Sequence, residues 1–109
     1  MARRSRTLKG APEYHAERVA EIHGQIEQGL REAARTAEQP RLAQTRNGCR
    51  IFFDVIRSLE DRVGRAQGHL DGVAGSTAAT TAMFKTQKRL ASRVGSMGTK
   101  FKRRCMKGV

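Results

Sequence analysis

The sequence predicts an all-α protein, either a three-helix bundle or a helical hairpin with a basic C-terminal amphipathic helix. The 109 residues include only two prolines, and apolar residues recur at steps of three and four in three successive segments. No segment alternates apolar and polar residues for long enough to indicate a strand. The length favours one domain, with residues 1–10 as a basic arm and residues 11–109 as the helical domain.

The first helix is predicted over residues 12–39. Pro12 suits a first helical turn, where a missing N–H would have no partner in any case, and Pro40 marks the end. Gly24 and Gly29 weaken the helix relative to alanine, so it needs packing to persist. Its apolar face carries Val19, Ile22, Ile26 and Leu30.

The second helix is predicted over residues 48–73, and Asn47 before it is either a turn residue or the helix cap. Phe53 is adjacent in sequence to the core residue Phe52, so the two side chains cannot face the same way. The Phe53 side chain is therefore expected to cover a flank of the bundle or a partner. Glycines recur every fourth residue near the C-terminal end, at Gly64, Gly68 and Gly72, which fits either a fraying end or a close helix crossing. The expected core positions are Phe52, Val55, Ile56, Leu59 and Val63.

The third helix is predicted over residues 77–106, with Ser76 or Thr77 as its N-terminal cap. Gln87 is the one polar residue on its apolar face, and two glycines near residue 96 are expected to kink or interrupt it. Its core positions are Leu90, Val94, Met97 and Phe101, with Met83 and Cys105 on the same face.

The charge is high and unevenly distributed. The formal net charge is +12 and the pI is about 11.2. Residues 11–39 hold six glutamates against three arginines, whereas residues 75–109 hold nine cations and no acid. Such a field attracts nucleic acid, an acidic protein or an anionic membrane surface. The membrane is disfavoured because the basic segment has no Trp, and no apolar run of about 18 residues could span a bilayer.

These charges predict a non-enzymatic protein that contacts nucleic-acid phosphates with little sequence specificity, since the chain has no Trp and one Tyr. The alternative is a structural or assembly protein that docks on an acidic protein surface or self-assembles, as a homo-oligomer or within a larger assembly. The predicted contact residues are Arg3, Arg4, Arg6, Lys85, Lys88, Arg89, Arg93, Lys100, Arg103, Arg104 and Lys107.

No catalytic, metal or cofactor site is predicted. The three histidines share no metal-binding spacing with Cys49 or Cys105, and no CxxC or HExxH motif occurs. Surface or interfacial positions are expected for the histidines. The two cysteines are expected to be free thiols in a reducing compartment. With no apolar stretch after the basic N-terminus to indicate a secretory signal, a cytoplasmic or virion-associated location is expected.

Three sequence features together resemble a known group. They are the stretch RTLKGAPEYH after a basic start, the segment NGCRIFFDVIRSLEDRVGRAQGH, and a short basic helix that ends near a second cysteine. This arrangement resembles small helical proteins of unassigned function encoded by tailed bacteriophages. The resemblance implies an accessory or virion-associated protein whose basic helix touches packaged DNA or a larger structural protein. It implies no catalytic residue.

Overall fold

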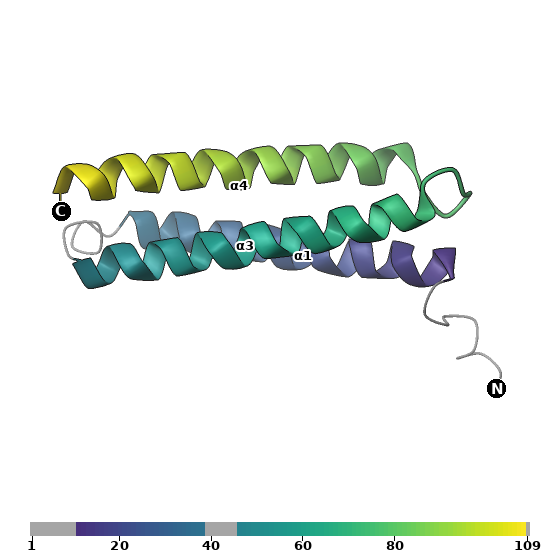
Figure 1. Ribbon diagram of the computed structural model, residues 1–109, viewed down its shortest axis with the longest axis horizontal. Coiled ribbons are helices and arrows are strands. Elements are labelled where there is room, and N and C mark those ends of the chain that lie inside the picture. The colour runs from purple at the N-terminus through teal and green to yellow at the C-terminus, as the bar shows by residue number, and fades with distance from the viewer. Residues whose placement is uncertain (1–10, 39–45, 109) are drawn as a thin grey trace, which may run out of the picture.

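The computed structural model describes residues 11–38 and 46–108, which form three long helices lying side by side (Figure 1). The helices are α1 (Pro12–Ala37), α3 (Arg46–Val73) and α4 (Thr81–Gly108). Helix α3 runs antiparallel to the other two, and each helix packs against both neighbours. The prediction of an all-α three-helix bundle is confirmed. The predicted N-terminal arm, residues 1–10, lies outside the described residues.

The core forms three layers along the bundle. Near the start of α3, Ala33, Phe52, Ile56 and Phe101 pack with the two cysteines. The Phe52 and Phe101 rings lie 3.9 Å apart between centroids. The central layer is the largest and holds Ile22, Ile26, Leu30, Leu59, Ala66, Leu90 and Val94. The far layer holds Val19, Leu70 and Val73.

The structure places the expected core positions inside the bundle, at two levels of burial. Val55, Val63 and Met97 are partly buried and pack against the central layer. The others are buried: Val19, Ile22, Ile26, Leu30, Phe52, Ile56, Leu59, Leu90, Val94 and Phe101.

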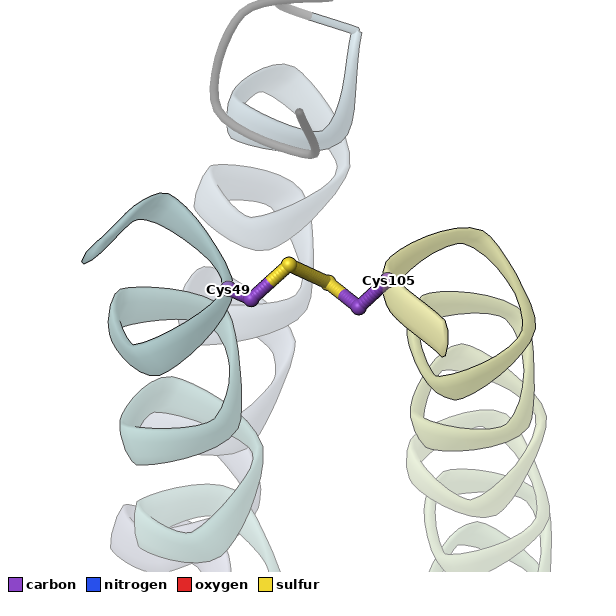
Figure 2. The surroundings of a disulfide bond; sticks show 2 residues. All are labelled: Cys49 and Cys105. Atoms are coloured by element: carbon purple, nitrogen blue, oxygen red, sulfur yellow. A yellow bond between two sulfur atoms is a disulfide. The ribbon is translucent and has the colours of Figure 1, made fainter. Parts of the chain in front are cut away.

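A disulfide joins α3 to α4, so the prediction of free thiols is wrong. Cys49 lies in the first turns of α3 and Cys105 in the last turns of α4, and Figure 2 shows their sulfur atoms bonded across the space between the helices. Their Cα atoms are 5.9 Å apart although 56 positions separate them in sequence. The antiparallel course of α3 and α4 brings the two ends together, and sequence separation alone does not reveal this.

The helix ends differ from the sequence prediction. α3 begins at Arg46, so Asn47 lies inside the helix instead of capping it. α4 begins at Thr81, four residues later than predicted, and Thr80 caps it by accepting a hydrogen bond from the Met83 amide at 3.2 Å. Ser76, one of the two predicted caps, instead accepts a bond from a backbone amide inside the connecting turn.

The evenly spaced glycines of α3 do not mark a helix crossing. A Cβ atom built at Gly64 or Gly68 would meet nothing within 4 Å, and one at Gly72 would touch only the His15 ring, at 3.6 Å. The helix ends at Val73, one residue after Gly72, and the fraying of this end stays a prediction.

Close packing occurs instead at two other glycines. A Cβ atom on Gly29 would lie 2.6 Å from Leu59 Cδ2, and one on Gly98 would lie 3.2 Å from Ile56 Cγ2. Glycine therefore lets α1 and α4 approach α3 at these points. α4 is helical throughout Thr81–Gly108, so the predicted interruption at its glycines does not occur.

Candidate nucleic-acid interface

The outer face of α4 is cationic. Its apolar residues turn inward at three- and four-residue steps, which leaves the long basic side chains on the opposite side. The structure places eight exposed cations on this helix, seven of them predicted contacts and the eighth Lys102: Lys85, Lys88, Arg89, Arg93, Lys100, Lys102, Arg103 and Arg104. The remaining predicted contacts, Arg3, Arg4, Arg6 and the Lys107 side chain, lie outside the described residues.

Little of this charge is neutralised by the bundle itself. Arg89 donates a hydrogen bond to Glu27 on α1 at 2.9 Å, and this bond holds the pKa of the Glu27 carboxyl below its ordinary value. The nearby charge of Arg93 lowers that pKa further. Within the described residues, no ion pair involves Lys85, Lys88, Lys100, Lys102 or Arg103.

A hollow of about 670 Å³ lies along the C-terminal half of α4. Two hydroxyl side chains and three cations line it: Ser96, Thr99, Lys100, Arg103 and Arg104. Thr99 donates its hydroxyl hydrogen to the Gly95 carbonyl at 3.1 Å, so the Ser96 hydroxyl and the cations are the groups here that suit phosphate oxygens.

The positive charge also accumulates towards the end of the bundle that carries the disulfide, where α3 begins and α4 ends (Figure 1). In this half the described side chains include nine Lys and Arg against four acids, over residues 26–38, 46–59 and 96–105. In the opposite half they hold seven against six, over residues 11–25, 60–73 and 81–95. The disulfide end therefore carries most of the net positive charge of the described residues.

A second hollow, an open groove of about 620 Å³, lies at this end between α3 and α4. Arg46, Arg50 and Arg57 line it together with Phe53, Asp54 and the two bonded cysteines. None of the three arginines was among the predicted contacts, because α3 as a whole has nearly balanced charge. The signal in the sequence was their spacing: positions i, i+4 and i+11 share one side of a helix.

One of the three histidines, His23, is buried in the core. His23 is 7% exposed, and its Nε2 donates to Gln87 Oε1 at 2.8 Å, while Gln87 Nε2 donates to the Val63 carbonyl at 3.0 Å. Gln87, the polar residue on the apolar face of α4, therefore connects all three helices in the core. Surface or interfacial positions were expected for the histidines, whereas His23 lies in the core between the helices. The unmatched Gln87 was the available signal, since a buried amide needs a partner.

The other two histidines meet at the opposite end of the bundle from the disulfide. The Nδ1 atoms of His15 and His69 are 2.7 Å apart, and the Tyr14 ring packs edge-on against both imidazoles. Desolvation lowers the pKa of His69, and the charges of His15 and Arg18 lower it further. Over the described residues, no group of three or more His, Cys, Asp or Glu side chains could hold a metal ion.

Comparison with protein-family models, with curated proteins and with solved structures gave no match. The resemblance to phage-encoded helical proteins therefore stays a prediction, as does the non-enzymatic role. Among the described segments, none of the helices has the length and apolar character needed to cross a bilayer.

Proposed function

We propose that this protein binds nucleic acid through the phosphate backbone, with α4 as the principal contact element. The observation that supports the proposal is the row of exposed cations on α4, most of which have no carboxylate partner within the described residues. Unpaired like charges on one helix repel each other, and a polyanion relieves that repulsion.

The length of the row fits a nucleic-acid backbone. From Lys85 to Arg103 the helix rises about 27 Å at its standard 1.5 Å per residue. A duplex of that length, about eight base pairs, presents phosphates at a density of one charge per roughly 1.7 Å of axis. The cations therefore meet several phosphates at once, whatever the base sequence.

Binding of this kind depends steeply on salt. If six to eight phosphates are neutralised, the logarithm of the binding constant falls against the logarithm of salt concentration with a slope of about −5 to −7. Specificity between sequences is expected to be small, because backbone contacts carry no base information.

The decisive experiment measures binding of the full chain to random-sequence duplex DNA over a salt series. The double variant Lys100→Glu, Arg103→Glu removes two exposed contacts from α4, and we expect it to lose at least about tenfold in affinity at 0.1 M salt. The control, Arg18→Glu with Arg65→Glu, makes the same change in net charge at cations that pair with acids on their own helices.

Equal losses in the two double variants would contradict a site on α4, because they would reflect net charge alone. Absence of binding by the wild type at low salt would overturn the proposal. A stoichiometric protein complex that survives nuclease treatment would instead support a structural role on an acidic protein surface.

A further inference from the structure

The groove between α3 and α4 at the disulfide end combines cations with an aromatic ring. We infer that it binds a single-stranded segment of nucleic acid, with one base stacked on Phe53 and the adjoining phosphates held by Arg46, Arg50 and Arg57. This inference rests on the proposed function and assigns it a preferred form of nucleic acid.

The three arginines are the phosphate-binding part of the proposed site. Arg46, Arg50 and Arg57 are exposed, line the same groove, and form no ion pair or side-chain hydrogen bond within the described residues. Arg50 lies about one helical turn from Arg46, and Arg57 about two turns further on. They therefore form a row along the groove, and a guanidinium binds a phosphate with two parallel N–H donors.

Phe53 is the base-stacking part of the proposed site. Its side chain is partly buried against the Phe52 layer of the core, which holds the ring in place, yet it forms part of the groove lining. A groove of about 620 Å³ lies within the size range of nucleotide-scale ligand sites. A base inside a duplex already stacks on its neighbours, so an aromatic ring between arginines favours an unpaired base.

The disulfide fixes the geometry of the groove. Cys49 and Cys105 both line it, and their bond ties the first turns of α3 to the last turns of α4 (Figure 2). The one α4 residue in the lining, Cys105, is thus held against the α3 wall before any ligand arrives, which reduces the ordering that binding requires.

One acidic side chain in the groove repels the phosphates of the ligand. Asp54 lines the groove beside Phe53, and its carboxylate repels phosphate. Replacing it by asparagine keeps the size of the side chain and removes the charge. Asp54→Asn is therefore expected to strengthen single-strand binding, an effect that a damaged fold cannot produce.

The test measures fluorescence anisotropy of a labelled mixed-sequence DNA strand and of its blunt duplex with the oxidised full chain. Phe53→Leu is expected to weaken single-strand binding by about fivefold or more and duplex binding by much less, because leucine fills the site but offers no ring. Phe84→Leu is the control, since Phe84 is 38% exposed on α4 among cations but lies outside this groove.

A second readout needs no variant. Ultraviolet crosslinking to a strand that carries bromouracil, followed by trypsin and mass spectrometry, is expected to label the peptide that runs from Ile51 to Arg57 and contains Phe53.

The outcomes separate the two proposals. Single-strand binding that Phe53→Leu weakens selectively, that Asp54→Asn strengthens, and that crosslinks to this peptide supports the groove. DNA binding that neither variant changes selectively, or crosslinks confined to other peptides, overturns the groove but leaves the α4 proposal standing. Absence of binding to either form of DNA overturns both.

Discussion

Removing the Cys49–Cys105 bond is expected to cost this protein a large part of its stability. The bond closes a loop with a sequence separation of 56, and both cysteines are buried, at 6% and 3% exposure. Either reduction by a dithiol or the substitution Cys105→Ser opens this loop.

The magnitude follows from the loop length. Loop-closure entropy for about 57 residues gives roughly 4 kcal/mol at 25 °C. Domains of this size are stable by only about 5–15 kcal/mol in total. With an unfolding entropy of roughly 2.1 cal/mol/K per residue, the same loss lowers Tm by roughly 15–20 °C.

The assay is thermal and urea unfolding, followed by circular dichroism of the helices, with and without reductant. Reduced wild type and oxidised Cys105→Ser are expected to agree, because both lack the crosslink. Alkylation before and after reduction, read by mass, shows whether the thiols were bonded in the oxidised sample. A fall in Tm of only a few degrees in a sample shown to be bonded would refute the loop-entropy reasoning.

Three further perturbations test the packing and the histidines. Gly24→Ala is expected to stabilise α1 by about 1 kcal/mol through helix propensity, whereas Gly29→Ala displaces Leu59 and is expected to be about 1–3 kcal/mol less stable than Gly24→Ala in urea unfolding. Gln87→Leu leaves the buried imidazole on α1 without its hydrogen-bond partner, so a loss of about 1–3 kcal/mol is expected in the same assay. The folded state holds the pKa of His69 below its unfolded value, so its stabilising contribution is present above about pH 6.5 and is lost as pH falls through the folded pKa. Unfolding at a series of pH values is expected to show a smaller acid loss in His69→Gln than in the wild type, and equal losses would exclude this histidine as a source.

The fold was predictable from sequence because each helix carries an apolar stripe that must be buried. The stripe around Ile22 and Ile26, the one around Phe52 and Leu59 and the one around Leu90 can be covered together only by packing side by side. Periodicity determines which face turns inward, but it carries no information about which residues of different helices meet.

That missing information accounts for the features that sequence reasoning did not find. The disulfide, the contact between His23 and Gln87, and the groove around Phe53 each depend on the register of one helix against another. The start of α4 was misplaced for a local reason. The run from Ser76 to Thr81 offers several hydroxyl caps, and the turn around Gly75, whose φ is +88°, uses Ser76 for its own hydrogen bonding.

The same charges that favour a polyanion also work against the fold, which links stability to binding in a direction that can be checked. The cationic end of the bundle repels itself, and it is there that the disulfide and the stacked pair Phe52–Phe101 hold α3 to α4. Sodium chloride screens that repulsion, with a Debye length that shortens from about 10 Å at 0.1 M to about 3 Å at 1 M. Added salt should therefore raise Tm of the free protein while it weakens binding to DNA. If Tm does not respond to salt, the cations of α4 are already neutralised within the molecule, and the basis for the proposed interface is lost.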